Sequence, residues 1–202
     1  MSTPKIQTDL LQLPVDSEPI RYLLSYVKED FEDVRWTGKT YPYEKLPILE
    51  DAENGLRLGQ SFSIARYLGR KYNLVGKTEA EAAKCDEYAD VLKDILLEVE
   101  LVVEAGEKKN LELKKEIQTN LLEKTRYFSV IESVLKKNGG KYLVGNAITW
   151  IDFLCAHMPE TFTFCVEKDV LANYPTMKAY QQQIYQIPEI KAWIAKRPVN
   201  PY

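Results

Sequence analysis

The stretch EKLPILE, residues 44–50, places an apolar strand directly after a proline and is the strongest indication of the fold. Proline has no backbone N–H, so Pro47 is unsuited to the ladder of an ordinary central strand. A cis peptide bond before Pro47 would form a tight turn and leave the backbone of Leu46 free to pair with an extended ligand. The stretch therefore predicts a sheet edge that can receive a peptide.

A polar pair, Gln60 and Ser61, follows this stretch and precedes the apolar run IARYL at residues 64–68. Serine is favoured at helix starts, where capping by its hydroxyl contributes about 1 kcal/mol. A helix start also offers unpaired N–H groups and a favourable dipole to an anion. The two uses of Ser61 are compatible. Together with Leu46 and Pro47, the pair predicts a cradle for a peptide that carries a carboxylate.

Strand and helix patterns alternate over residues 1–75. Ile20 and Leu23 share one face of an amphipathic helix, and the Asn54-Gly55 pair favours a hairpin turn between two strands. The expected elements are strands 5–13, 33–36, 46–50 and 56–59 and helices 18–27 and 61–72. This order of elements predicts a thioredoxin-like unit.

Residues 79–202 show only helical patterns, and residues 73–78 form the linker. The residues Thr149 and Asp152 have the spacing of a capping box, which begins a helix that Pro159 is expected to bend or end. The expected helices are 79–104, 111–137 and three more that begin near Thr149, Pro175 and Pro188. The second part of the chain is therefore predicted to be all-helical.

Five segments resemble, in the right order, the cytosolic glutathione transferases, most closely the sigma class of insects and other animals. They are the EKLPILE stretch with its polar pair, residues 18–21 (EPIR), 31–35 (FEDVR), 67–72 (YLGRKY) and 148–153 (ITWIDF). The resemblance covers nearly the whole chain. It implies a thioredoxin-like glutathione-binding domain over residues 1–75, an all-α domain over residues 79–202 that forms the hydrophobic substrate site, and a homodimer.

The resemblance also implies that glutathione is the cosubstrate. The residues that would bind it are Lys45, Leu46, Pro47, Gln60, Ser61 and Asp94. Leu46 would act through its backbone, and Ser61 would receive the γ-glutamyl carboxylate. Lys45 is placed to reach the glycine carboxylate, although a plain surface lysine fits its position equally. Asp94 resembles an acid that sigma-class relatives present across the dimer interface, and a solvated acidic face is the alternative.

The sequence departs from the sigma pattern at its catalytic end. The tyrosine that activates the glutathione sulfur in that class corresponds to Leu10, which cannot hydrogen-bond a thiolate. Ser17 is a candidate replacement that resembles the serine-dependent classes, although its spacing matches neither pattern. The segment before Pro47 is shorter than usual and omits the tryptophan and lysine that normally hold the glycine carboxylate. Trp36 and Lys39 are the candidates to replace them.

Composition excludes several other functions. The net charge is −3 with both signs mixed, so no nucleic-acid footprint is present. No apolar run approaches the roughly 20 residues of a membrane helix, and no signal-peptide pattern opens the chain. Cys85, Cys155 and Cys165 lack metal-ligand spacing and are predicted to be reduced and buried. The single histidine, His157, excludes zinc sites with two histidines. We expect a cytoplasmic protein without a metal.

These patterns predict a glutathione transferase that conjugates or otherwise processes a hydrophobic electrophile, in the manner of a detoxification enzyme. Its activity is expected to be weak or specialised because of Leu10. Two alternatives stay open: a non-catalytic carrier of glutathione or a hydrophobic ligand, and a structural protein on the same scaffold. Gln60 and Ser61 favour a working glutathione site, whereas Leu10 and the shortened segment favour the alternatives.

Overall fold

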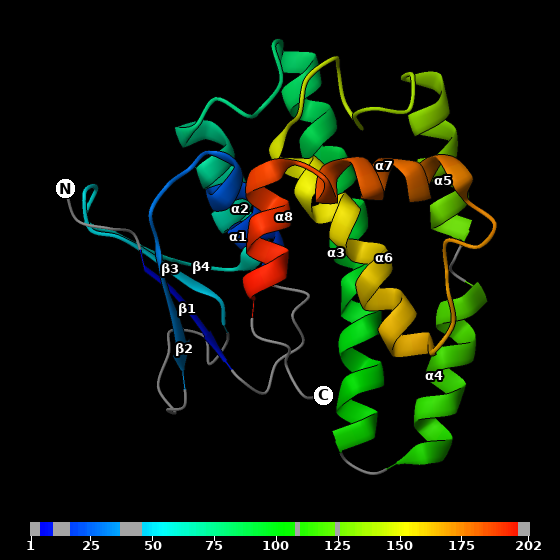
Figure 1. The fold of residues 1–202 in the computed structure, drawn as a ribbon. Coiled ribbons are helices and arrows are strands. Elements are labelled where there is room, and N and C mark those ends of the chain that lie inside the picture. Colours follow the sequence, from blue (N-terminus) through cyan, green and yellow to red (C-terminus); the bar gives the residue numbers. More distant parts are fainter. Residues whose placement is uncertain (1–4, 10–16, 37–45, 108–109, 124–125, 198–202) are drawn as a thin grey trace. The chain divides into compact units, whose positions relative to one another are not determined.

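The computed structural model describes residues 5–9, 17–36, 46–107, 110–123 and 126–197. These residues form two compact units (Figure 1). The first contains the described residues up to Val75 together with those from Tyr185 onward, and the second runs from Gly76 to Ile184. The division after Val75 falls inside the predicted linker. The C-terminal helix, however, packs with the first unit, whereas the sequence-based boundary assigned it to the helical domain.

The first unit is built on a four-stranded mixed sheet in the order β2-β1-β3-β4. Its strands are β1 (Lys5–Asp9), β2 (Glu32–Trp36), β3 (Ile48–Asp51) and β4 (Leu56–Gly59). β1 and β2 are parallel, and β3 is antiparallel to both β1 and β4. All four strands were predicted from the sequence. β3 begins at Ile48 and not at Leu46, in accord with the missing N–H of Pro47.

Three helices belong to the first unit: α1 (Glu18–Tyr26), α2 (Ser61–Lys71) and α8 (Pro188–Lys196). Pro19 and Pro188 lie in the first turns of their helices, where a missing N–H breaks no helical hydrogen bond. The predicted apolar face of α1 is buried, with Ile20 and Leu23 fully enclosed. α8 joins this core because its residue Ile190 is also fully buried, which explains why the C-terminal helix groups with the first unit.

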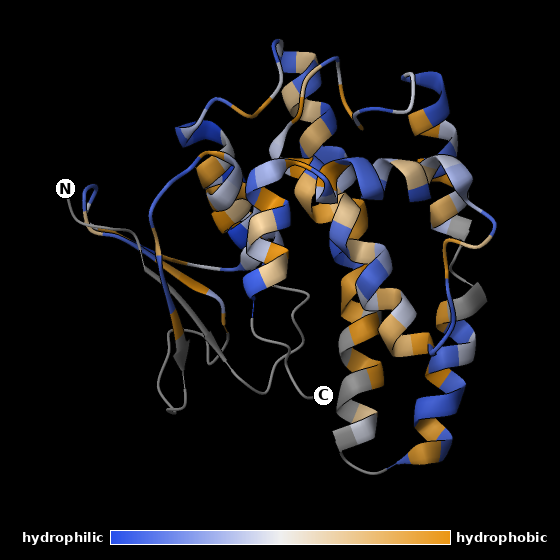
Figure 2. Ribbon diagram, viewed as in Figure 1, coloured by the Kyte–Doolittle hydropathy of each residue, from blue (hydrophilic) through white to orange (hydrophobic). Residues whose placement is uncertain are grey.

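The second unit is helical, as the sequence predicts. Its helices are α3 (Glu79–Glu107), α4 (Leu111–Glu123), α5 (Arg126–Lys137), α6 (Trp150–Val166) and α7 (Pro175–Tyr185). The single helix predicted for residues 111–137 is represented by α4 and α5, with residues 124–125 outside the described part. Figure 2 shows apolar residues along α3 and α6, and α6 is buried at every position from Trp150 to Pro159.

Helix α6 is anchored at its start by a buried carboxylate. Asp152 accepts hydrogen bonds from the N–H and hydroxyl of Thr149 at 2.7 and 2.9 Å, which confirms the predicted capping box. The Leu143 N–H and the Tyr180 hydroxyl each donate to Asp152 at 2.8 Å. Pro159 does not end the helix, which continues to Val166. Of the two predicted outcomes, a bend or an end at Pro159, the end is therefore excluded, since the packing around a buried helix outweighs one lost hydrogen bond.

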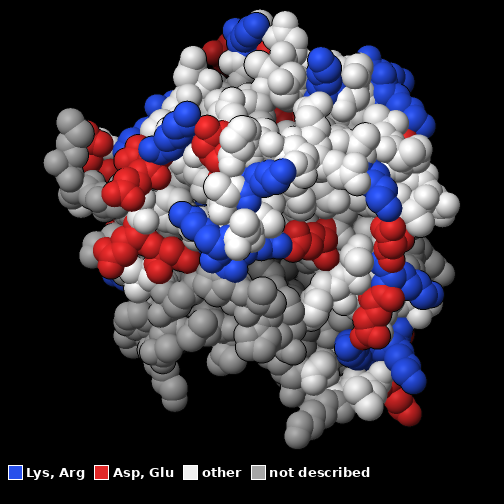
Figure 3. Space-filling model, viewed as in Figure 1, with Lys and Arg blue, Asp and Glu red and all other residues white. Residues whose placement is uncertain are grey.

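Acidic and basic side chains alternate over the face of the molecule seen in Figure 3, in keeping with the mixed charge pattern of the sequence. Among the residues that the structure describes, no helix combines the length and the hydropathy needed to cross a bilayer.

Candidate functional site

The predicted cradle is assembled at one edge of the sheet by strand register. Ile48 pairs with Gly59 in the antiparallel β3–β4 ladder. The residues just before Ile48 and just after Gly59 therefore lie next to one another. This pairing brings the cis peptide bond between Leu46 and Pro47 beside the start of α2. The pairing of β3 with β4 thus places Leu46 and Pro47 next to Gln60 and Ser61.

The carboxyl ends of the other two strands meet at the same edge. Gln7 of β1 pairs with Ile48 in antiparallel register, so β1 runs towards this edge as it approaches Asp9. β2 runs parallel to β1, and its last residue, Trp36, lies opposite Asp9. Leu10, which follows Asp9 directly, lies outside the described residues. The sheet therefore directs the ends of β1 and β2 to the edge where the cradle lies.

Leu46 and Pro47 are both buried on the core side of this edge. The Leu46 side chain packs in the core, so the main chain is the part of this residue that can meet a ligand. The peptide bond before Pro47 is cis, as considered from the sequence, whereas the backbone role of Leu46 toward a ligand stays a prediction.

The start of α2 differs from the sequence-based prediction in one respect. Ser61 was considered a helix cap, but the N-cap is Gln60 and Ser61 is the first helical residue. The Gln60 side chain forms no capping hydrogen bond within the described part of the chain, and the first turn contains no acidic residue. An uncapped helix start presents its N–H groups and its positive dipole end to an anion. Ser61 itself is buried, and Gln60 is exposed.

A cluster of polar side chains fixes the other end of α2 to the β3–β4 hairpin. The Tyr67 hydroxyl and the Lys71 ammonium each donate to Asp51 Oδ2 at 2.7 Å, and the Asn54 amide donates to it at 3.0 Å. Burial alone would raise the pKa of the Asp51 carboxyl, but these hydrogen bonds hold it well below its usual value. Sequence reasoning missed this cluster, although Tyr67 and Lys71 have the spacing of one helix face.

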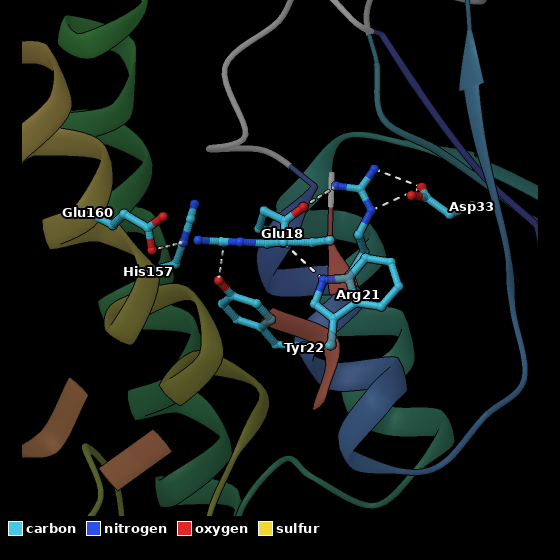
Figure 4. A network of polar contacts seen from close by, with 8 residues as sticks. Glu18, Arg21, Tyr22, Asp33, His157 and Glu160 are labelled. Carbon is cyan, nitrogen blue, oxygen red and sulfur yellow. Dashed lines mark hydrogen bonds and ion pairs between the residues drawn. The ribbon is translucent and has the colours of Figure 1, made fainter. Parts of the chain in front are cut away.

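The start of α1 holds a second buried network, shown in Figure 4. Arg21 donates to Glu18 Oε1 at 2.7 Å, and its Nε and Nη2 donate to Asp33 Oδ1 at 3.0 and 2.8 Å. Glu18 and Arg21 are both buried. The EPIR segment was recognised from the sequence as a helix start, but the ionic role of Glu18 and Arg21 was not. Ser17 is the N-cap of α1, and its carbonyl accepts hydrogen bonds from the N–H groups of Ile20 and Arg21.

The roles of the remaining predicted site residues stay predictions. Lys39 and Lys45 lie outside the described residues, as does Leu10. Trp36 ends β2 at the cradle edge, but only its main chain is described. Asp94 is exposed on α3 of the second unit, and its role across a dimer interface stays a prediction.

The three cysteines are free and buried, as predicted. Burial raises the pKa of the Cys85 thiol to about 11 and that of Cys165 to about 12, and it raises the pKa of Cys155 as well. Thiols with raised pKa values carry little thiolate at neutral pH and are poor nucleophiles. His157 is buried on α6 with its Nδ1 3.6 Å from Glu160, as Figure 4 also shows.

A thioredoxin-like sheet with a cis-proline edge, followed by a helical unit, is the architecture of the glutathione transferases. Residues 93–197 match the family described as "Glutathione S-transferase, C-terminal domain". Glutathione S-transferase S1 of Drosophila melanogaster is 33% identical over 196 residues, which cover 91% of this chain and 75% of that protein. The chain belongs to the glutathione S-transferase family.

Two further relatives are prostaglandin synthases. Hematopoietic prostaglandin D synthase of Rattus norvegicus is 33% identical over 192 residues, covering 90% of this chain and 91% of that protein. The solved structure of prostaglandin synthase D of Nilaparvata lugens superposes with a TM-score of 0.83 at 31% identity, covering 98% of this chain and 100% of that one. The family to which this chain belongs therefore includes both transferases and prostaglandin D synthases.

Proposed function

We propose that this protein is a sigma-like glutathione transferase that binds glutathione at the cradle formed by Leu46, Pro47, Gln60 and Ser61. The observation that carries the proposal is the β3–β4 register, which sets the cis peptide bond beside the uncapped start of α2. The main chain at Leu46 offers hydrogen-bonding groups to the cysteinyl part of an extended peptide. The start of α2 offers N–H groups, the Ser61 hydroxyl and the helix dipole to the γ-glutamyl carboxylate.

The other ends of glutathione are assigned to residues outside the cradle. Lys45, or its substitutes Trp36 and Lys39, would hold the glycine carboxylate. Asp94 would pair with the glutathione amine across the interface of a homodimer, since a carboxylate is a suitable partner for an ammonium group. Its exposure on α3 is compatible with such a role.

The proposed reaction is attack of the glutathione thiolate on a hydrophobic electrophile, as in cytoplasmic detoxification. The S–H bond breaks and a sulfur–carbon bond forms, while the attacked carbon gives up either the bond to a leaving group, which departs with its electron pair, or the π bond across which the thiolate adds. The thiol proton goes to solvent or to the anion that the electrophile forms. A free thiol with a pKa near 8.5 is mostly protonated at neutral pH, so a donor that stabilises the thiolate accelerates the step. Leu10 supplies no such donor, and Ser17 is the candidate replacement. We therefore expect slow turnover of general electrophiles.

A non-catalytic role on the same scaffold is the second candidate, and Leu10 is the residue that favours it. A carrier would bind glutathione or a hydrophobic ligand without forming a conjugate, and a structural protein would bind neither. A conjugation assay separates enzyme from carrier, and retention on a glutathione column separates carrier from structural protein.

Calorimetric titration with glutathione tests the cradle directly. Ser61→Ala is expected to weaken binding by about tenfold or more, because hydrogen bonds to charged groups contribute about 1.5–3 kcal/mol. Ser133→Ala, at an exposed position of α5, is the matched control and should bind like the unchanged protein. Equal affinity of Ser61→Ala and the unchanged protein would place the ligand elsewhere. Failure of the unchanged protein to bind glutathione would remove the proposal and favour a structural role or a carrier of a hydrophobic ligand.

A further inference from the structure

The C-terminal helix α8 reaches a buried carboxylate at the start of the first helix. The Trp193 indole N–H donates to Glu18 Oε2 at 3.1 Å. Arg197, just beyond the end of α8, donates from Nη1 to the same oxygen at 3.5 Å and to the Tyr22 hydroxyl at 2.7 Å. The other oxygen, Glu18 Oε1, accepts a hydrogen bond from Arg21 Nη1 at 2.7 Å. Within the part of the chain that the structure describes, Glu18 therefore receives donors from α8 and from the residue that follows it, as well as from Arg21.

These contacts extend into a single network that joins three elements of the first unit. Arg21 also donates two hydrogen bonds to Asp33 of β2, as Figure 4 shows. Two carboxylates, of Glu18 and Asp33, are balanced by two guanidinium groups, of Arg21 and Arg197. An aromatic contact accompanies the charges, since the ring centroids of Trp193 and Phe31 lie 5.2 Å apart.

The balance of this network depends on α8. A buried carboxylate is stable only while donors and opposite charges surround it, and removal of one partner leaves a costly, uncompensated charge. Glu18 is 3% exposed and Arg21 is 1% exposed, so water does not replace a lost partner readily. Displacement of α8 would remove the indole N–H of Trp193 and the guanidinium group of Arg197 from Glu18 Oε2. The start of α1 would then hold a buried carboxylate that has lost these two donors.

We propose that α8 is a strap that positions α1, with Trp193 and Arg197 as positioning residues that act through Glu18. The first unit is complete only when α8 is docked. Loosening of α8, whether by substitution or by a partner that competes for it, loosens the first turns of α1 as well. The structural order of α1 thus depends on the contacts that α8 and Arg197 make with it.

Hydrogen exchange of the full-length protein tests this coupling. Arg197→Met keeps the length of the side chain and removes its guanidinium group. Amides of both α1 and α8 are expected to lose protection together, on the order of tenfold, as for the loss of a hydrogen bond to a charged group. The control is Lys191→Met, an exposed residue of α8 whose ammonium donates to Gln186 at 2.9 Å. It should leave α1 unchanged. Loss of protection in α8 alone, or in neither helix, would overturn the proposal.

A double-mutant cycle provides an independent test, since Arg197 also touches Tyr22. Urea denaturation midpoints are measured for Glu18→Gln, for Arg197→Met and for the double variant. If the two residues act on each other, the double variant shifts the midpoint by less than the sum of the single shifts. Additive shifts would show that Arg197 does not act through Glu18, and the strap would then be rejected.

Discussion

Gln60 lies at the start of α2 with φ of 71° and ψ of 111°. Glu167 also has a positive φ, but its φ of 56° and ψ of 31° belong to the ordinary left-handed region. The conformation of Gln60 is rarer and costs on the order of 1–3 kcal/mol, which surrounding structure must offset. Backbone strain of this kind gathers at ligand sites. Its position between β4 and the uncapped turn of α2 therefore supports the proposed cradle.

Asp51 is the residue through which acid should weaken the hairpin that carries the cradle. Its pKa in the folded protein is lowered from 3.8, chiefly because hydrogen bonds from Lys71, Tyr67 and Asn54 outweigh the effect of burial. A group whose pKa falls on folding contributes stability above its unfolded pKa and loses that contribution as the pH drops through its folded pKa. The Asp51 carboxylate therefore stabilises the first unit at neutral pH and ceases to do so in strong acid.

The prediction concerns the free energy of unfolding of Asp51→Asn. The variant is expected to be less stable than the unchanged protein at pH 7, and the difference in stability is expected to narrow progressively below about pH 4, near the ordinary aspartate pKa of 3.8. Urea denaturation at a series of pH values measures it. Asp30→Asn, an exposed position of the same unit, should show little difference at any pH. A gap for Asp51→Asn that does not change with pH would contradict the assignment.

At the scale of single elements, α6 depends on one carboxylate more than on its own helix propensity. Asp152 accepts hydrogen bonds from Thr149, Leu143 and Tyr180 and is fully buried. Alanine in its place leaves the N–H groups of Leu143 and Thr149 without this acceptor, and each unsatisfied buried donor costs about 1–3 kcal/mol. The Tyr180 hydroxyl keeps the main-chain carbonyl of residue 152 as an acceptor, at 3.2 Å. Asp152→Ala is therefore expected to lower the free energy of unfolding by about 3 kcal/mol or more, measured by urea denaturation.

The control for this variant is Asp169→Ala. Asp169 is exposed and pairs with Lys178 at 3.1 Å, and exposed pairs contribute less than about 1 kcal/mol. A loss of comparable size in both variants would mean that charge alone, and not the buried cap, accounts for the effect of Asp152.

Most elements were predictable from the sequence because their signals are local. The strands of the sheet, the proline starts of α7 and α8 and the capping box of α6 each depend on a few neighbouring residues. The contacts of Glu18 were not predictable, because its partners Trp193 and Arg197 lie at the other end of the chain. Whether α6 would end at Pro159 or continue past it could not be decided from the sequence for the same reason, since its continuation depends on packing by distant segments.

The candidate site also has features that were predictable from local sequence and features that were not. The possibility of a cis bond at Pro47 follows from local sequence and is confirmed. The backbone role of Leu46 toward a ligand stays a prediction. The displacement of the cap from Ser61 to Gln60 follows from the β3–β4 register, which fixes where the helix can begin. Pairing between strands is not encoded at any one residue, so this detail required the structure.

At the scale of the whole molecule, the proposed homodimer is testable on α3. Leu97 and Leu101 are 49% and 48% exposed, and they follow Asp94 at helical spacing. Exposed leucines on one helix face are typical of a surface that another chain covers. Leu97→Glu is expected to convert a dimer to monomers in sedimentation velocity, because a buried, unpaired charge opposes association. Leu113→Glu, on α4, should leave the dimer intact. A monomeric unchanged protein would remove the dimer from the proposal.

The packing of α8 against α1 also bears on how the protein is made. A ribosome produces the chain from its N-terminus, and domains usually fold in the order in which they emerge. Here the first unit includes α8, which follows the whole second unit in the sequence. Glu18 therefore lacks Trp193 and Arg197 until the second unit and α8 have been made. The second unit, although later in the sequence, can complete its own core before the first.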